Sequence, residues 1–366
     1  MSFPTAASAI PAPAPPPEVL TGDYIKIGVN GFGTLGSDGS TPPGILYDGT
    51  GTGTFNSAYD YLTPGSPFEG FSLYGFKGGT AFSVSNNNDA GRGRVISTGN
   101  LTLFNGVEYA DAGNTYDNRA VWTGTYDNYF TITHDYHFND DGQQLNITTT
   151  IEALADLTGL NFARFTDPDA QAAAGDDSRT NNFQGANGVA ASDLVYAEAL
   201  VSKYVIGLYT SDPTTHASAV TTWMMDPAVF LAGGNIGNGD NLIGLGFNIG
   251  DLDLGEKFTF NYRYIFGTDI SAALGAAGAG GGGGGPKPTI QDGGSYTVEQ
   301  LLSGAVDPTF NGGVLTLGSS GAAPTDFTVE TAGGTIDTAG HDLTLSGVLS
   351  GPGALNKSGA GVLTLT

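Results

Sequence analysis

Residues 333–366 carry the pattern that most limits how this chain can fold. Short apolar alternations at 335–337, 343–345 and 361–365 are separated by turns that contain glycine. Strands of this length cannot bury an apolar face alone, so each has to stack on the next one along the chain. The pattern therefore predicts a coil of stacked strands, a β-solenoid, in this part of the sequence.

Within this stretch, residues 347–365 follow the pattern G-x-L-x-G-x-G-x-L-x-K-x-G-x-G-x-L-x-L. The pattern closely resembles the autotransporter-associated β-strand repeat, which occurs in the passenger regions of self-exported outer-membrane proteins of Gram-negative bacteria. This resemblance implies the start of a right-handed β-helix and a location on the outer surface of the cell after removal of a signal peptide. We expect Leu355, Leu363 and Leu365 to point into the coil.

The residues before 270 predict a different β architecture. Glycine supplies 59 of the 366 residues and charged residues only 13%, which favours many turns and short strands. Alternation at period two is clearest in a hairpin at 129–151 and in a strand at 257–266, where aromatic residues share one face. At least ten such segments, with almost no helical periodicity, predict an all-β fold: a large antiparallel, supersandwich-like β-sandwich.

Two shorter features refine this prediction. Residues 152–164 and 226–231 are the only weak helix candidates. Residues 159–169 moderately resemble part of the β-rich N-terminal domains that precede such repeats in outer-membrane autotransporter proteins.

Changes in composition divide the chain into four segments. Residues 1–20 are rich in alanine and proline and predict a disordered leader. The sandwich follows at 21–270, a linker with six consecutive glycines at 271–288, and the β-helix segment at 289–366. The resemblance implies further repeats and a membrane-anchoring barrel beyond Thr366.

The charge balance and the absence of cysteine exclude several functions. The net charge of −24 repels phosphate backbones and anionic lipids, so no nucleic-acid partner is expected. Without cysteine there are no disulfides, thiolate metal sites or cysteine nucleophiles. No stretch of 18 apolar residues exists, so we expect no direct membrane insertion by this segment.

One glycine motif looks like a dinucleotide-binding loop. Gly31, Gly33 and Gly36 follow an apolar segment with the spacing G-x-G-x-x-G. That function needs a helix to open at the third glycine. The chain instead continues with the turn-forming residues of 37–44, and we interpret the glycines as turn residues.

An acidic loop is the candidate cation site. Asp167, Asp169, Asp176 and Asp177 are close in sequence, and calcium prefers carboxylate and carbonyl oxygens. The spacing lacks the central glycine and closing glutamate of an EF-hand. The alternative is that these carboxylates are turn and solvation residues.

Aromatic residues offer a second kind of site. Trp122, Tyr126, Tyr129 and Trp223 are candidates for stacking on sugar faces, although a place in the core is the simpler interpretation. His134 and His137 fall on opposite faces of one predicted strand and cannot ligate one metal together. No nucleophile elbow, phosphate-binding loop or catalytic triad can be assembled, so we assign no catalytic residue and no cofactor beyond calcium.

These observations favour a non-enzymatic extracellular module. In this hypothesis the sandwich recognises a glycan or protein of a host surface or matrix, and the β-helix holds it away from the cell. One alternative is self-assembly with copies of itself into a filament or surface layer through exposed strand edges. Another is a carbohydrate-binding or carbohydrate-active protein; the enzyme would need two carboxylates within about 10 Å in a cleft.

Overall fold

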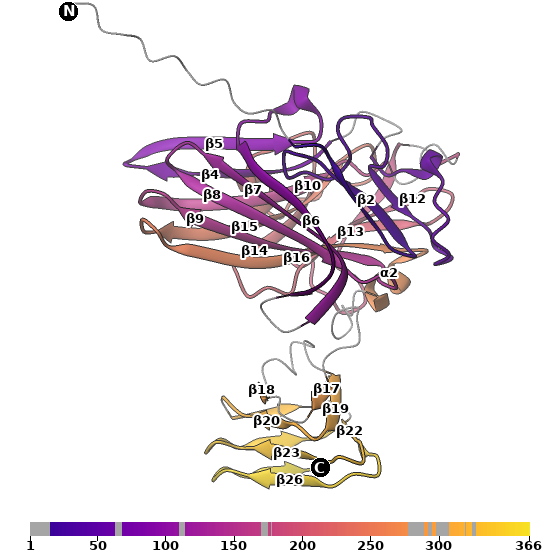
Figure 1. Cartoon of the computed structure of the whole chain (residues 1–366), viewed down its shortest axis with the longest axis vertical. Coiled ribbons are helices and arrows are strands. Elements are labelled where there is room, and N and C mark those ends of the chain that lie inside the picture. Colours follow the sequence, from indigo (N-terminus) through magenta and orange to yellow (C-terminus); the bar gives the residue numbers. More distant parts are fainter. Residues whose placement is uncertain are drawn as a thin grey trace, which may run out of the picture. The chain divides into compact units, whose positions relative to one another are not determined.

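The computed structural model describes residues 15–62, 68–109, 114–169, 175–176, 178–276, 289–291, 295–297, 307–318, 320–323 and 327–366. Strands dominate this part of the chain, and the predicted all-β class is confirmed. The chain divides into two compact units, Met1–Ala273 (unit 1) and Leu274–Thr366 (unit 2) (Figure 1). The predicted linker spans this division, and its residues 277–288 lie outside the described residues. Among the described helices, none has the length and apolarity needed to cross a membrane.

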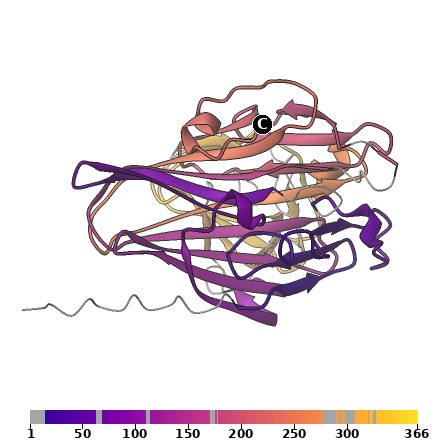
Figure 2. The same cartoon turned by 90° about the horizontal axis from the view of Figure 1, so that it is seen from above.

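Unit 1 contains three antiparallel sheets (Figures 1 and 2). The smallest consists of β1 (Glu18–Thr21), β2 (Ile25–Val29) and β3 (Ile45–Tyr47). The five-stranded sheet has the order β14-β15-β10-β4-β5, with β4 (Glu69–Lys77), β5 (Thr80–Asn87), β10 (Leu157–Thr166), β14 (His216–Thr221) and β15 (Leu242–Leu252). The eight-stranded sheet has the order β11-β12-β13-β16-β9-β8-β7-β6, with β6 (Ser97–Tyr109), β7 (Asn114–Tyr126), β8 (Phe130–Phe138), β9 (Gln144–Ala153), β11 (Thr180–Gln184), β12 (Leu194–Ala199), β13 (Val205–Tyr209) and β16 (Lys257–Gly267).

The two larger sheets pack face to face around an aromatic core. Phe162 of β10 lies edge-on to Phe260 of β16, with ring centroids 5.1 Å apart. Phe71 of β4 lies edge-on to Trp122 of β7 at 5.6 Å. All four side chains are fully buried, and this removal of large apolar surfaces from water stabilises the packing of the sheets.

The hairpin predicted at 129–151 is confirmed as β8 and β9. Its predicted inward residues on β8, from Phe130 to Phe138 at every second position, are all buried. The strand predicted at 257–266 is confirmed as β16, where Phe260, Tyr262, Tyr264 and Phe266 are buried. Period-two alternation therefore identified the inner face of the eight-stranded sheet.

Helices are short in unit 1, and one helix prediction was wrong. Residues 157–166 form β10, because pairing with both β4 and β15 places Leu160 and Phe162 in the core. The candidate at 226–231 is confirmed as α1 (Pro227–Leu231), which Asp226 caps by accepting a hydrogen bond from the Ala228 N–H. The sequence missed α2 (Ile270–Ala276), which lies at the start of the predicted linker, and the 3₁₀ turns η1 (Ser57–Tyr59) and η2 (Ala90–Arg92).

One ion pair is fully buried between the sheets. Arg164 of β10 donates from Nε to Oε1 of Glu69 of β4 at 2.6 Å. The same carboxylate accepts hydrogen bonds from the Tyr264 hydroxyl at 2.7 Å and the Leu35 N–H at 2.5 Å. Burial disfavours the charge of Arg164, but the Glu69 carboxylate outweighs it and raises the pKa of Arg164 well above its usual range.

The described strands of unit 2 belong to three parallel sheets. The first contains β17 (Thr289–Gln291), β19 (Asp307–Asn311), β22 (Phe327–Val329) and β25 (Leu349–Ser350); the second contains β18 (Ser295–Thr297), β20 (Val314–Thr316), β23 (Gly334–Asp337) and β26 (Leu355–Ser358); the third contains β21 (Gly321–Ala323), β24 (Leu343–Leu345) and β27 (Leu363–Leu365). From β19 to β27 the chain adds one strand to each sheet in turn. Val314, Thr335 and Asn356 consequently stand side by side on neighbouring strands.

Unit 2 has its own apolar core. Phe310 and Phe327 stack with ring centroids 5.8 Å apart, and Ile336 is fully buried. Leu355 and Leu363 pack against this core, as predicted. Leu365 does not: it lies at the end of β27, and its side chain is 55% exposed.

Candidate functional site

Strand pairing in the five-stranded sheet gathers three acidic residues at one end of it. β10 and β15 are antiparallel neighbours, with Thr166 opposite Ile243. The residues that follow β10 therefore lie beside those that precede β15. Asp167 and Asp169 meet Asp240 there, and one carboxylate oxygen from each lies within 4.8 Å of the other two.

Backbone hydrogen bonds hold the loop after β10 in place. The Asp167 N–H donates to the Phe68 carbonyl at 2.7 Å, which continues the pairing of β10 with β4. The Asp169 N–H donates to the Tyr61 carbonyl at 3.1 Å. These two hydrogen bonds hold the backbone of Asp167 and Asp169 in place. The backbone position in turn brings the two side chains near each other.

The surroundings of the three carboxylates differ. Asp167 and Asp169 are each only 4% exposed, whereas Asp240 is exposed. The pKa of Asp167 is raised to about 8 by burial, by the charges of Asp169 and Asp240 and by a hydrogen bond with Asp240. The positive charge of Arg92 acts in the opposite direction and lowers this pKa. Oδ1 of Asp167 is enclosed, and none of the described residues donates a hydrogen bond to it.

An aromatic and cationic group lies next to this acidic cluster. Phe68, whose carbonyl binds the Asp167 N–H, packs edge-on to Trp223 with ring centroids 5.3 Å apart. The Arg92 guanidinium lies over both rings, 5.2 Å from Phe68 and 5.0 Å from Trp223. Because Trp223 is partly exposed, its indole can contact solvent or a ligand. Two separate predictions, Trp223 for glycans and Asp167 with Asp169 for calcium, therefore fall in one region.

The structure places the other predicted cation ligands differently. Asp176 accepts hydrogen bonds from the Val201 N–H at 2.5 Å and the Ser202 N–H at 3.2 Å. It therefore fixes the turn between β12 and β13 and is not a member of the cluster with Asp167 and Asp169. Asp177 lies outside the described residues.

Two of the predicted glycan contacts belong to the sandwich interior or its edge. Trp122 is fully buried, and its Nε1 donates to the Gly31 carbonyl at 3.0 Å, so it is a core residue and not a surface contact. Tyr126 is partly buried and packs against Tyr129 with ring centroids 5.0 Å apart. These two rings remain partly exposed, at the turn between β7 and β8.

Sequence reasoning missed Asp240. It lies in a glycine- and asparagine-rich loop shortly before β15. In the sequence it therefore looks like an ordinary turn residue before a strand. Its place beside Asp167 and Asp169 depends on the register between β10 and β15, which neither segment of sequence shows by itself.

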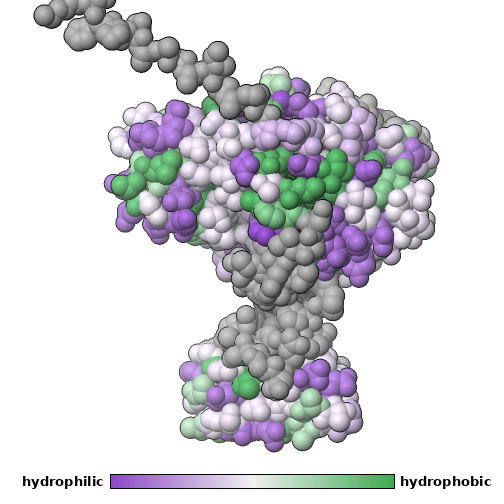
Figure 3. Space-filling model, in the orientation of Figure 1, coloured by the Kyte–Doolittle hydropathy of each residue, from purple (hydrophilic) through white to green (hydrophobic). Residues whose placement is uncertain are grey.

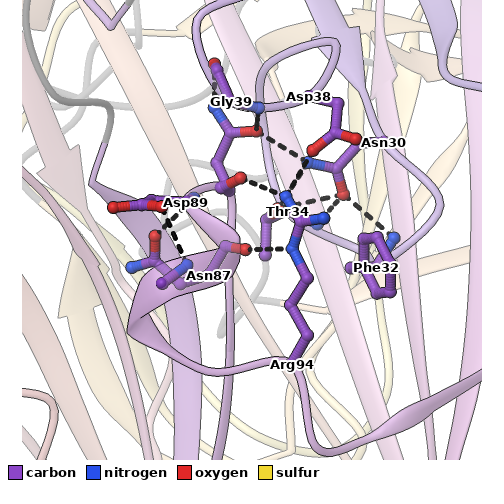
Figure 4. Close-up of polar contacts among 10 residues, drawn as sticks. Asn30, Phe32, Thr34, Asp38, Gly39, Asn87, Asp89 and Arg94 are labelled. Carbon is purple, nitrogen blue, oxygen red and sulfur yellow. Dashed lines mark hydrogen bonds and ion pairs between the residues drawn. The ribbon is translucent and has the colours of Figure 1, made fainter.

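The glycine motif at 31–36 forms a closed polar turn, and no helix opens at Gly36. Asn30 Nδ2 donates to Oδ1 of Asn88 at 2.9 Å, and Asn30 Oδ1 accepts from the Phe32 N–H at 2.9 Å. Arg94 covers the Phe32 ring and binds Asp38 and Asn87, as the close-up in Figure 4 shows. Arg94 also donates to the Asn88 carbonyl. These groups satisfy one another, and the interpretation of the glycines as turn residues is confirmed.

An open apolar pocket of about 410 Å³ lies on unit 1 beside α1. Its lining comes from β14, α1 and the segment that follows: Ala219, Val220, Thr221, Ala228, Val229, Ala232, Gly234 and Ile236. No carboxylate lines this pocket, so it does not supply the acid and base of a glycosidase.

Comparisons with known proteins leave the family of this chain open. No protein-family model matches it, and no curated protein matches it. Among solved structures, a bacterial glucoamylase complexed with acarbose aligns at 11% identity and a TM-score of 0.44, over 75% of this chain and 36% of that one. An α-galactosidase from Geobacillus stearothermophilus aligns at 9% and 0.37, over 72% and 42%, and an α-mannosidase from Enterococcus faecalis at 10% and 0.36, over 75% and 32%. The chain thus spans less than half the length of these proteins, and at these values the likeness establishes neither a shared fold nor a shared activity.

Proposed function

We propose that this protein is a non-enzymatic surface module of an autotransporter passenger, in which unit 1 recognises a partner and unit 2 displays it. The observation that carries the proposal is the order of strands in unit 2. Successive strands enter three parallel sheets in turn, and equivalent residues such as Val314, Thr335 and Asn356 stack side by side. A β-helix requires this order of strands, and the right-handed form is what the resemblance of the repeat pattern at 347–365 implies.

A coil of this kind has a simple physical function. Each turn contacts only its neighbours, so added turns increase the length without changing the core. A compact, supersandwich-like body joined to such a coil can be held away from a cell surface. The partner of unit 1 would then be a glycan or protein of a host surface or matrix.

Trp223 is the best-placed residue for glycan contact. Its indole is partly exposed, and the Arg92 guanidinium lies over the ring, 5.0 Å from its centroid, so it brings hydrogen-bond donors close to the aromatic surface. Aromatic rings stack on the apolar faces of sugars, while basic groups bind hydroxyl or carboxylate oxygens. Neutral sugars are therefore the favoured class, because the net charge of −24 and the neighbouring carboxylates repel anionic ones.

A glycan array with the full chain tests this recognition function. We expect binding that decreases at least tenfold in Trp223→Ala and persists in Phe183→Ala, which removes another partly exposed aromatic ring, 38% exposed on β11. Equal binding by both variants would remove Trp223 from the proposal. If the wild-type chain bound no glycan and no cell or matrix preparation, the recognition function itself would be contradicted.

Self-assembly is a second candidate, favoured by an edge strand. β6 ends the eight-stranded sheet and pairs there with β7 alone. Phe104 of β6 and Val121 of β7 are partly exposed, and Figure 3 shows an apolar patch on the face of unit 1 that it presents. Edge strands of this kind template pairing with another chain. Negative-stain imaging at several protein and calcium concentrations would show regular polymers for this function and dispersed particles for a monomeric module.

A carbohydrate-active enzyme is the third candidate, and one observation favours it. Asp167, with its raised pKa, lies close to Asp169 and Asp240, a pairing that glycosidases use for acid and base roles. The burial of both Asp167 and Asp169 opposes access by a sugar chain. Hydrolysis of a polysaccharide panel that disappears in Asp167→Asn would support the enzyme; an inactive wild-type protein agrees with the surface module.

A further inference from the structure

The acidic cluster at the end of the five-stranded sheet contains a buried oxygen that lacks a hydrogen-bond partner. Asp167 is 4% exposed, and its Oδ1 receives no hydrogen bond from the described residues. A buried carboxylate oxygen without a donor is unfavourable, because the water it lost on folding is not replaced. Such an atom therefore points to a positive ligand that accompanies the folded protein.

Two further carboxylates lie close to Asp167. One carboxylate oxygen each of Asp167, Asp169 and Asp240 lies within 4.8 Å of the others. Arg92 is the nearby basic residue that acts on Asp167, but its guanidinium lies over the rings of Phe68 and Trp223. Carboxylates at this separation disfavour one another's charged forms in a partly buried site, and a cation between them removes that cost.

We propose that Asp167, Asp169 and Asp240 bind one calcium ion. An ion with bonds of about 2.3–2.6 Å to each ligand bridges oxygens up to roughly 5 Å apart, which matches the spacing of this cluster. Carboxylates can bind calcium through one or both oxygens, and water or carbonyl groups complete its six to eight ligands. Exposed Asp240 lets the ion enter, while buried Asp167 and Asp169 shield it from solvent.

The position of the site gives the ion a structural consequence. It ties the segment after β10 to the segment before β15 at the end where these neighbouring strands lie together. It also lies beside Phe68, whose ring contacts Trp223. Calcium would therefore rigidify this end of the sheet and the partly exposed aromatic surface next to it. This inference does not depend on the proposed function.

Isothermal titration of the chelator-treated full chain with calcium chloride is the test. We expect one ion per chain for the wild type. Affinity should fall at least tenfold in both Asp167→Asn and Asp240→Asn. It should stay unchanged in Asp253→Asn, which removes the same charge just beyond the opposite end of β15. Magnesium should bind more weakly than calcium, because it demands six short bonds in an octahedral arrangement.

Thermal unfolding separates ion loss from misfolding. Asparagine has nearly the size of aspartate, so without calcium the Tm of Asp167→Asn should stay close to that of the wild type, while its rise in Tm on adding calcium should vanish. No calcium binding by the wild type at millimolar concentrations would overturn the proposal. Equal binding by wild type, Asp167→Asn and Asp240→Asn, or tighter binding of magnesium, would overturn it as well.

Discussion

At the scale of single residues, the Glu69–Arg164 pair is the most demanding feature of the sandwich core. Both side chains are fully buried, and the carboxylate also accepts hydrogen bonds from Tyr264 and Leu35. Replacing one member of such a pair leaves the other as an uncompensated charge in a medium of low dielectric. The pair therefore matters less for the energy it adds than for the cost of breaking it.

The first prediction is that Glu69→Gln lowers the free energy of unfolding of unit 1 by about 3–5 kcal/mol, because Arg164 loses its counter-charge. Urea unfolding monitored by tryptophan fluorescence measures the loss. The control is Lys257→Gln, which breaks the exposed pair with Glu152 and should cost about 1 kcal/mol or less. Similar losses for the two variants would contradict this account of the core.

The second prediction concerns His134 and pH. Burial and the charge of Arg164 lower the pKa of His134 well below its usual value of 6.5. Below about pH 6.5 the unfolded chain takes up a proton that the native state refuses, so stability falls as the pH decreases through that range. The slope from this residue alone should approach about 1.4 kcal/mol per pH unit. His134→Gln should show a correspondingly smaller slope between pH 6.5 and 5.5, and an unchanged slope would be evidence that His134 is not buried in its neutral form.

At the scale of elements, the turn after β2 depends on glycine for both conformation and space. Gly33 has a φ of +71°, and an added Cβ would lie 2.3 Å from Trp122. Its carbonyl also accepts a hydrogen bond from the Tyr136 hydroxyl at 2.6 Å. Gly78, in the turn between β4 and β5, has a φ of +56° but nothing within 4 Å of an added Cβ.

The third prediction compares these two glycines. Gly78→Ala should cost about 1–2 kcal/mol from the left-handed backbone alone. Gly33→Ala should cost about 1–3 kcal/mol more, since the methyl group also forces Trp122 to move. The free energies of unfolding of the two variants provide the measurement, and equal losses would show that Trp122 does not pack against this turn.

The same elements show how far the sequence could predict the fold. β8, β9 and β16 were predicted because their aromatic and β-branched residues alternate strictly. β10 was assigned to a helix candidate, since its local pattern is weak and its strand character comes from two flanking partners and an irregular register near Gly159.

The candidate site shows the limit more sharply. Asp167 and Asp169 were identified from their type and spacing, but Asp240 depends on the register of β15 with β10. Trp122 was considered as a surface contact because residue type alone does not say which face of a sheet a side chain occupies. Packing against Phe71 decides that question in three dimensions.

At the scale of the whole molecule, the division into two units has thermodynamic consequences. The apolar clusters described in unit 1 and in unit 2 are separate, the former in the sandwich and the latter in the parallel sheets. Such cores can unfold in separate transitions. A change confined to one core should leave the transition of the other unit in place.

The fourth prediction is that calorimetry of the full chain resolves two unfolding transitions. Ile336→Ala should destabilise only the transition of unit 2, by about 2–5 kcal/mol, because Ile336 is fully buried there. Leu365→Ala, at a position 55% exposed, should change it by about 0.5 kcal/mol or less. A single transition shifted by Ile336→Ala would contradict the independence of the two units.

The central claim is that unit 2 displays unit 1 on the outside of a Gram-negative cell. The most direct measurement is the binding of an antibody against unit 1 to intact cells of the organism that produces this protein. The account predicts labelling of intact cells that external protease removes. Labelling that appears only after the cells are lysed would contradict it.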